Sequence, residues 1–415
     1  MSFRPSLRLV LLALSAPCIV AAQEHPDLPS IGNGARAVGL GFATTAVADD
    51  IYAIGWNPAG LSYLTRREVA VASRFLFAGT SASATDPTPA SYPKYSAAGE
   101  ITGALDAIEF VGVALPYRVL GRTVAAGLAY RRFTEGVRVG TFETIRRQAN
   151  GTYKGSTKYA STGGVRAISP SLGFEVTPQI RVGVTANLLT GSTIYTQRRP
   201  APAPAYRTRE LKHGGVALEA GALYRVSDAL QFGLQVTLPH DRTLRWDNDT
   251  TIRDVTRKAP LAVAVGAVLG LSPTARVSAD VRHSPWSGAE YLEDATGDTV
   301  ATRVGKNDAS SIHVGYERDR EREIMNIYGV ATGLLRTKQR LGLFARQSSV
   351  VDLKGRSIRI LGISAGQSWL RGRGSVDLGL LYARSSQWTY AESSALRMEL
   401  NAHDFVFSLA LRRQF

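Results

Sequence analysis

Residues 230–238 read Leu-Gln-Phe-Gly-Leu-Gln-Val-Thr-Leu, so that large apolar side chains alternate with Gln, Gly and Thr. Successive side chains of a β-strand point to opposite faces, and this segment therefore predicts a strand with one apolar and one polar face. The same alternation runs through residues 180–188 and 275–282. In the uncharged run 259–275 large residues alternate with Ala and Gly, which also predicts a strand and not a membrane helix.

A soluble β-sandwich and a transmembrane β-barrel both show such alternation. Three features favour the barrel. The segments run for about 10 to 15 residues, which matches or exceeds a tilted strand that spans a bilayer. Their polar faces repeatedly carry Arg, Glu, Asp and Gln, and tight turns alternate with long polar loops. We predict an all-β fold, with an antiparallel transmembrane barrel over residues 67–415.

The spacing of short turns predicts the number of strands. With both barrel ends on one side, six such turns give 14 strands, and long loops are expected near 80–105, 136–160, 196–208, 248–256, 287–307, 348–355 and 389–397. The fifth turn is the least regular, because 321–340 is too long for its single strand. The predicted turns are Leu120-Gly121, Thr177-Pro178, Ser227-Asp228, Ser272-Pro273, Arg318-Asp319 and Arg371-Gly372.

Aromatic residues and the last strand agree with a barrel in a membrane, because Trp and Tyr rings form girdles at the two interfaces. The predicted girdle residues are Trp246, Trp286 and Trp388 at outer strand ends and Trp369, Tyr117, Tyr224 and Tyr316 at inner ends. The chain ends in Phe415, preceded by Phe405, Phe407, Leu409 and Leu411 at alternate positions. This ending resembles the assembly signal of bacterial outer-membrane barrels and implies the barrel assembly machinery as a partner.

Residues 1–22 have the pattern of a secretory signal. Arg4 and Arg8 precede an apolar stretch that ends in Val20-Ala21-Ala22. A lipoprotein signal at Cys18 is an alternative, but Pro17 precedes the cysteine where a small residue is expected. Cleavage after Ala22 removes the only cysteine of the 415-residue chain and lowers the formal charge from +15 to +13.

The remaining charge lies partly in loops and partly on predicted inner faces. Export argues against nucleic acid as the partner of the basic loops, which can meet lipopolysaccharide phosphates or remain solvated. The inner-face residues form the predicted polar lining of the lumen, either as a solute path or as internal ion pairs. They are Arg181, Glu219, Arg276, Asp280, Arg282 and Asp377.

Residues 23–66 differ from everything that follows and are predicted to form a plug, or hatch. Gly32, Gly34 and Ala37 nominally fit a dinucleotide fingerprint, but no strand precedes them and no βαβ unit surrounds them. Asp49 and Asp50 are placed to cap a short helix that reaches Ile54 and ends before Asn57-Pro58. The glycines favour close backbone packing in a confined space.

The block GARAVGLGFATTAVADDIYAIGWNPAGLSYL, residues 34–64, resembles the amino-terminal hatch of the FadL/TodX family of outer-membrane transporters, and the related PorV/PorQ branch opens in the same way. Asn57, Pro58 and Ala59 match the NPA motif of that hatch. The resemblance implies a 14-stranded barrel in the outer membrane of a Gram-negative-type bacterium. In this arrangement Asn57 fixes the plug backbone, Pro58 stiffens the turn and Ala59 allows close packing; the alternative is that the triplet simply ends a helix.

Two functions follow from the resemblance. The first is a passive channel for hydrophobic or amphipathic small molecules of the fatty acid or hydrocarbon type. The second is a PorV-like outer-membrane component of a type nine protein secretion system, which would have secretion-system proteins as partners. Outer-membrane lipid and lipopolysaccharide are expected partners in both cases. Neither function requires a cofactor.

The sequence argues against an enzyme. The six histidines are not paired at metal-ligand spacing with Cys, His or clustered carboxylates. His283-Ser284 and His403-Asp404 fall near strand ends, but no nucleophile elbow surrounds either pair. We therefore expect no catalytic site and no metal site.

Overall fold

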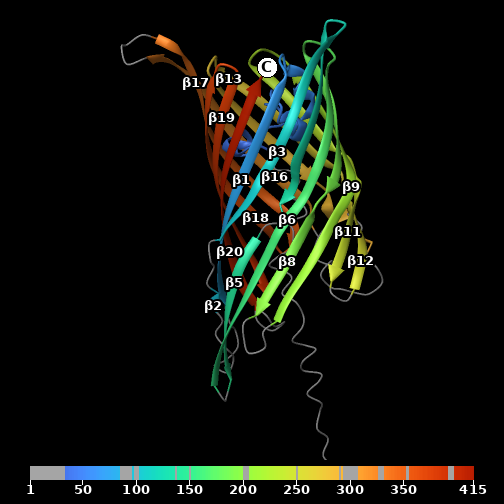
Figure 1. Cartoon of the computed structure of the whole chain (residues 1–415), viewed down its shortest axis with the longest axis vertical. Helices are drawn as coiled ribbons and strands as arrows, with labels where there is room; N and C mark the ends of the chain where they lie inside the picture. The colour runs from blue at the N-terminus through green and yellow to red at the C-terminus, as the bar shows by residue number, and fades with distance from the viewer. Residues whose placement is uncertain are drawn as a thin grey trace, which may run out of the picture.

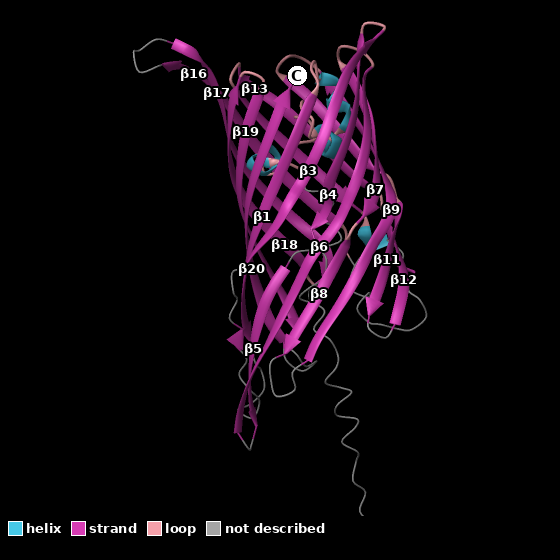
Figure 2. Ribbon diagram, in the orientation of Figure 1, coloured by secondary structure: helices cyan, strands magenta, loops and turns pink. Residues whose placement is uncertain are grey.

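The computed structural model describes residues 33–84, 96–97, 102–135, 138–148, 151–199, 205–248, 251–288, 291–292, 307–325, 331–351, 355–390 and 397–415. The predicted signal at 1–22 and the predicted plug residues before Asn33 lie outside this part of the chain. Within it the fold is a single closed antiparallel sheet with three short helical segments inside (Figures 1 and 2).

The described segments form 14 strands around the wall, which confirms the predicted fold class and strand number. Four of these strands are interrupted and carry two labels each, and β2 (Ser96–Ala97) and β15 (Tyr291–Leu292) are two-residue segments beside the wall. The strands are β1 (Glu68–Ala84), β3 (Thr102–Val119), β4 (Arg122–Glu135) with β5 (Arg138–Gln148), β6 (Gly151–Glu175), β7 (Ile180–Thr190) with β8 (Ser192–Arg199), β9 (Ala205–Arg225), β10 (Leu230–Thr237) with β11 (His240–Asn248), β12 (Thr251–Ala259) with β13 (Ala262–Ser272), β14 (Ala275–Ser284), β16 (Ala309–Met325), β17 (Ala331–Val351), β18 (Ser357–Arg371), β19 (Gly374–Tyr390) and β20 (Arg397–Gln414).

The barrel closes between its first and last strands. β1 pairs with β20 over its whole length, from Glu68 opposite Gln414 to Ala84 opposite Met398. Closure leaves no open sheet edge in the wall, which is the condition for β-structure to cross a lipid bilayer. Phe415 follows β20, and its backbone N–H donates to the carbonyl of Arg67 at 3.0 Å.

Burial along the strands is inverted relative to a soluble protein. In β7 the side chains of Ile180, Val184 and Leu188 are 40%, 51% and 46% exposed, whereas Thr185 and Asn187 are fully buried. A soluble sheet would bury the apolar set. The exposed apolar face is the one that lipid would cover, and the polar face points into the barrel.

Short connections gather at one end of the barrel, together with Phe415 (Figure 1). We call this the turn end and the opposite end the loop end. Five of the predicted turns join strands here: β3 to β4, β6 to β7, β9 to β10, β13 to β14 and β18 to β19. At the loop end several strands continue into the stretches expected to be loops, since β5 and β6 pair through Gln148 opposite Gly151.

The predicted turn at Arg318-Asp319 is wrong. Both residues lie inside β16, and β16 and β17 remain paired from Arg318 opposite Gln339 to Met325 opposite Ala331. The extension is a ladder of charges in which Asp319 lies 3.1 Å from Lys338 and Glu321 lies 2.7 Å from Arg336. The alternating charges stabilise strands beyond the barrel rim, where no apolar face marks them as strands.

The girdle prediction fails at Trp286. This residue lies in the short 3-10 helix η3 (Trp286–Gly288), 5% exposed, in a cluster with Ala259 and Ala309. Its ring therefore packs within the protein and does not face an interface. Tyr117, Tyr224 and Trp369 are 52%, 50% and 37% exposed near the turn end, as a girdle requires. The side chains of Trp246 and Trp388 are not among those described.

The plug is built from α2 (Ala35–Gly39), α3 (Ala53–Trp56) and the 3-10 helix η2 (Pro58–Tyr63). Asp50 Oδ1 accepts a hydrogen bond from the Tyr52 N–H at 3.0 Å, one turn before α3, and the helix ends at Asn57 in an extended conformation. We use the word plug for residues 33–66. Among the described residues, no helix is long and apolar enough to cross a membrane.

A pair of arginine substitutions at two depths tests which face meets lipid. Val265 and Leu271 lie on the outward face of β13, at 52% and 58% exposure, and Leu271 is next to the turn. Arginine at a lipid-facing midplane position costs about 2–4 kcal/mol and near an interface only about 0–1 kcal/mol. We expect Val265→Arg to lower the free energy of unfolding in lipid vesicles by the larger amount and Leu271→Arg by the smaller. Equal small losses in urea titrations would contradict a lipid-facing assignment.

Candidate functional site: the plug and its seat on the barrel wall

Asn57 joins the plug to the wall through its side-chain amide. The two N–H groups of Asn57 Nδ2 serve three carbonyls, so that one N–H is shared: Thr45 within the plug at 2.9 Å, Ala222 of β9 at 3.1 Å and Leu234 of β10 at 3.2 Å. Its Oδ1 accepts from the Ala59 N–H at 3.2 Å, which caps the start of η2. The residue is fully buried. One side chain therefore fixes two parts of the plug and two wall strands in a single geometry.

Pro58 and Ala59 lie directly against the wall beside this amide. Pro58 begins η2, where its missing N–H costs nothing because the first residues of a helix lack an internal partner. A Cβ added to Gly183 of β7 would overlap the Pro58 carbonyl carbon and the Ala59 N. A Cβ on Gly221 of β9 would overlap Asn57 Oδ1. The triplet rests on wall positions that only glycine allows.

Inward-facing glycines recur around the wall at the plug. A Cβ on Gly233 of β10 would overlap the Thr45 carbonyl, and one on Gly342 of β17 would overlap the Gly41 N. Glycine weakens a strand because it adds backbone entropy and no packing, and it commonly marks a place where another backbone approaches closely. These glycines let plug backbone contact wall backbone without intervening side chains.

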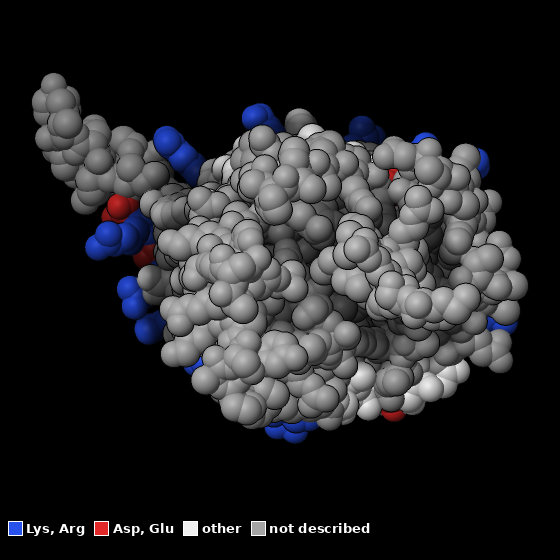
Figure 3. All heavy atoms as spheres, turned by 90° about the horizontal axis from the view of Figure 1, so that it is seen from below, with Lys and Arg blue, Asp and Glu red and all other residues white. Residues whose placement is uncertain are grey.

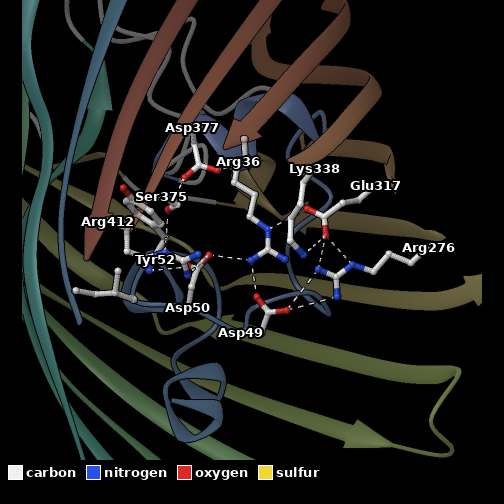
Figure 4. A network of polar contacts seen from close by, with 12 residues as sticks. Arg36, Asp49, Asp50, Tyr52, Arg276, Glu317, Lys338, Ser375, Asp377 and Arg412 are labelled. Carbon is white, nitrogen blue, oxygen red and sulfur yellow. Dashed lines mark hydrogen bonds and ion pairs between the residues drawn. The ribbon is translucent and has the colours of Figure 1, made fainter. Parts of the chain in front are cut away.

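A second set of contacts is electrostatic and centres on Arg36 of α2 (Figure 4). Its guanidinium forms ion pairs with Asp49 and, at 2.8 Å, with Asp50, both in the plug. It also lies 3.4 Å from Glu317 of β16, and the Arg36 side chain is only 7% exposed. The plug therefore presents a buried cation that is balanced partly by its own acids and partly by the wall.

Glu317 is the wall residue on which these charges converge. Besides Arg36 it contacts Arg276 of β14 at 2.5 Å, Arg340 of β17 at 2.6 Å and Lys338 at 3.7 Å, with its own side chain 2% exposed. Arg340 in turn lies 3.4 Å from Asp377 of β19. Removing one member of a buried ion pair typically costs about 3–5 kcal/mol, because it leaves an uncompensated charge. We call Arg36, Asp49, Asp50, Arg276, Glu317 and Arg340 the Arg36 network.

Asp49 is held ionised in this network. Burial disfavours its charged form, but the Arg36 and Arg276 guanidinium groups outweigh that cost and hold the pKa of the Asp49 carboxyl well below its ordinary value. The side chain is still 40% exposed, so water reaches it inside the barrel. The plug thus contributes a fixed negative charge at neutral pH.

Asp280 of β14 binds the plug backbone. Its Oδ2 accepts the Thr44 and Thr45 N–H groups at 2.8 Å each and the Thr45 hydroxyl at 2.7 Å, and Arg282 lies 3.3 Å away. Hydrogen bonds to a carboxylate are roughly twice as strong as bonds between neutral groups. The loop between α2 and α3 is therefore tied to β14 of the wall.

Arg181 and Glu219 complete the contacts predicted from the sequence. Arg181 of β7 donates to the Ser62 carbonyl at 3.0 Å, and its guanidinium lies 4.0 Å from the centre of the Tyr63 ring. Glu219 of β9 lies 3.1 Å from Arg131 of β4, which is fully buried beside α3. The Asn187 side chain accepts a hydrogen bond from Arg131 at 2.8 Å and donates one to the Ala217 carbonyl at 3.2 Å.

All six polar residues expected inside the barrel lie on its inner face, and the structure uses them as ion pairs and hydrogen bonds. Arg181, Arg276, Asp280 and Arg282 contact the plug directly, while Glu219 and Asp377 act through Arg131 and Arg340. The sequence analysis does not single out Arg36, Arg131, Glu317 or Arg340. The sequence does contain a signal for Glu317 and Arg340, because each is a charged residue at a position of its strand that faces inward.

An apolar patch borders the plug on its loop side. Phe133 of β4, Ala167 of β6, Leu189 of β7 and Ala217 of β9 lie one inward position beyond Arg131, Ser169, Asn187 and Glu219, and they cluster with Val165. Phe133 packs over the Arg131 guanidinium at 5.4 Å. On these four strands the inner wall therefore changes from polar at the plug to apolar at the next inward position. In the described residues, no group of His, Cys, Asp and Glu is arranged to hold a metal ion.

Three solved structures of bacterial proteins align with nearly the whole chain. The chain aligns with a Pseudomonas aeruginosa FadL homologue at a TM-score of 0.61 and 13% identity, over 92% of this chain and 98% of that one. It aligns with the Ralstonia pickettii toluene transporter TbuX at 0.55 and 14%, over 93% and 99%. It aligns with the Pseudomonas putida toluene transporter TodX at 0.56 and 11%, over 93% and 99%.

These alignments show a shared 14-stranded barrel fold. No protein-family model matches the sequence, and no curated protein matches it. At this level of identity the likeness concerns the fold, so the role of the plug in this chain has to be argued from its own contacts.

Replacing Asn57 tests whether its amide holds the plug closed. Asn57→Ala removes a buried amide whose two N–H groups serve three carbonyls, and a hydrogen bond of this kind is worth about 0.5–1.5 kcal/mol. We therefore expect more frequent opening events in planar-bilayer conductance. Asn187→Ala is the matched control, because it removes an equally buried amide that bonds only to the wall. Equal conductance of the two variants would mean that Asn57 does not keep the plug in place.

Proposed function

We propose that the protein is an outer-membrane channel for the passive uptake of hydrophobic or amphipathic small molecules, of the fatty acid or hydrocarbon type. The observation that carries this proposal is a helical segment inside the barrel that is seated on the wall by specific contacts and bordered by an apolar patch. The fold likeness to a FadL homologue and to two toluene transporters supports the same class of solute.

The proposed orientation sets the turn end toward the periplasm and the loop end toward the exterior, as is usual for barrels with short turns on one side and long loops on the other. The Arg36 network lies close to the turn end, since Arg276 follows the β13–β14 turn directly. A solute that enters from the loop end would reach the apolar patch before the plug. The residues of the patch are at most 7% exposed, so a solute contacts them only when neighbouring side chains move aside. The apolar surface that the solute then buries contributes about 25 cal/mol per Å².

Passage then requires the plug to move. Asn57, Asp280 and the glycine contacts hold it against strands on several sides of the barrel, so solute and plug compete for the same interior. A plug with two arrangements, one seated and one displaced, would open when solute binding favours the second. The charged wall residues serve mainly to seat the plug, and therefore their polarity does not argue against an apolar solute.

The secretion-component alternative rests on the resemblance of residues 34–64 to the PorV/PorQ branch. Two of the structures cited above carry the names of toluene transporters, and no contact in the described part of the chain favours a protein cargo. Lipopolysaccharide, outer-membrane lipid and the assembly machinery remain proposed partners of any barrel in this membrane. Phe415, 56% exposed at the turn end, is available for the last of these.

A cross-linked plug tests the proposed function. A Cβ at Gly127 of β4 would lie 3.1 Å from Ile54 Cγ1 of α3, which is the position that the sulfur of an Ile54→Cys side chain would take. Cells that lack their own fatty-acid channel and express Ile54→Cys/Gly127→Cys should take up labelled palmitate or toluene only after reduction. We expect at least a tenfold difference between the reduced and oxidised states, and no difference for a hydrophilic solute such as maltose.

The reduced state is the matched control, because it has the same substitutions without the tether. If expression of the unmodified chain does not raise uptake of either apolar solute, the channel proposal is wrong. If uptake continues with the plug cross-linked, the solute passes without plug movement and the gating part of the proposal is wrong.

A further inference from the structure

The extension of β16 and β17 beyond the barrel rim has two chemically different faces. Strand alternation continues from Glu317 and Arg340, which face inward, so Asp319, Lys338, Glu321 and Arg336 share the inner face. The opposite face carries Arg318, Arg320 and Arg322, whose cross-strand neighbours are Gln339, Thr337 and Leu335. The acids of the extension thus pair with β17 bases on one side and leave the other side purely basic.

The three outer-face arginines are available for an external partner. They are exposed, and within the described residues no carboxylate lies at ion-pair distance from any of them. On the inner face Asp319 and Glu321 are already bound to Lys338 and Arg336. β14 pairs with β16 only as far as Arg318, so the arginine face is not covered from that side.

The outer face of β16 follows the profile of a membrane from interior to surface. Ile312 and Val314 are 58% and 41% exposed on the lipid-facing side, Tyr316 comes next on the same face, and the arginines follow at every second position. Apolar residues suit the hydrocarbon region and an aromatic residue suits the interface. Arginine matches the phosphate layer, where its planar fork binds phosphate oxygens through two hydrogen bonds.

The extension also bends in a direction that brings its arginine face toward the surface of a surrounding membrane. In Figure 1, β16 and β17 bend outward from the barrel at the turn end and do not continue along its axis. In Figure 3, seen from the loop end, basic and acidic side chains project beyond the barrel outline on that side. When a strand bends outward, its outer face turns toward the surface of the surrounding membrane. The neighbouring β18 follows the same order, with Trp369 and then exposed Arg371 at its outer turn end.

We propose that the arginine face of the β16–β17 extension, formed by Arg318, Arg320 and Arg322, binds the phosphate groups of anionic phospholipids in the leaflet at the turn end of the barrel. The extension then lies over the membrane surface as a strap, with its ion-paired face toward water. Such binding fixes the barrel in depth and rotation against that leaflet. It is independent of which solute the lumen carries.

A fluorophore on the extension tests the proposal in the full-length protein. Thr337 faces outward opposite Arg320, and Thr337→Cys gives a single labelling site once the signal segment with Cys18 is removed. The labelled barrel is placed in two kinds of nanodisc. In one the quencher is attached to the headgroup of phosphatidylglycerol, and in the other to the headgroup of phosphatidylcholine. We expect at least twofold stronger quenching in phosphatidylglycerol. Arg320→Gln/Arg322→Gln should remove most of that difference, since each basic residue near an anionic surface contributes about fivefold in affinity.

The control variant is Arg359→Gln/Arg384→Gln, which removes the same charge from exposed residues at the loop end of β18 and β19. It should leave the quenching at Thr337 unchanged, and Arg320→Lys/Arg322→Lys should retain part of it. Heat-modifiable migration on gels shows that each variant is folded. Equal quenching in both lipids, or no loss in the glutamine variant, would overturn the proposal and leave the arginine face to a periplasmic protein. If inorganic phosphate abolishes the quenching at equal ionic strength, the site binds free phosphate, and the proposal is likewise overturned.

Discussion

The structure depends on the burial of charge inside a barrel whose outside is apolar. Lipid-facing strands place every second residue in the lumen, and in this chain many of those residues are Arg, Asp and Glu. An isolated charge in such an interior is costly, so each needs a partner at close range. Glu317 is shared by Arg36, Arg276 and Arg340, and Asp49, Asp50 and Asp377 supply the remaining negative charge. The wall and the plug are therefore two halves of one set of ion pairs, and neither half is satisfied without the other.

The glycines add a geometric condition to this electrostatic one. Positions such as Gly221 and Gly342 let plug backbone approach wall backbone, so Asn57 and Asp280 reach carbonyl and N–H groups on the opposite partner. The seat is consequently specific in shape and in charge. It is also made of many individually modest contacts, which is the kind of interface that a bound solute could shift from one arrangement to another.

The sequence predicted the wall well because alternation is local and repeated. The run 230–238 and the segments like it identify strands, faces and most turns without knowledge of their partners. Prediction from the sequence fails where the deciding contact lies far along the chain, or where strand residues alternate in charge and not in hydropathy. Residues 319–323 alternate in charge and not in hydropathy, and their pattern therefore predicts a turn in place of the β16–β17 extension. The sequence predicts a girdle position for Trp286, but the chain begins a 3-10 helix at this residue.

The plug illustrates the same limit. Asn57, Pro58 and Ala59 stand out in the sequence, but the wall carbonyls that Asn57 binds belong to residues 165 and 177 positions away. Inward glycines look like ordinary small residues until the plug is in place. Arg36 is one basic residue in a glycine-rich segment, and its importance appears only when Glu317 is brought within 3.4 Å of it.

The most direct test of this account measures amide hydrogen exchange across the plug in two glutamate variants. Glu317→Gln removes the acid shared by three guanidinium groups, whereas Glu321→Gln removes an acid of the same strand whose partner Arg336 is more than half exposed. A buried pair is worth about 3–5 kcal/mol when one member is lost and an exposed one about 0–1 kcal/mol. The account predicts much faster exchange in residues 35–63 for Glu317→Gln only, with the amides of β6 and β19 still protected. Unchanged protection of the plug in Glu317→Gln would contradict it.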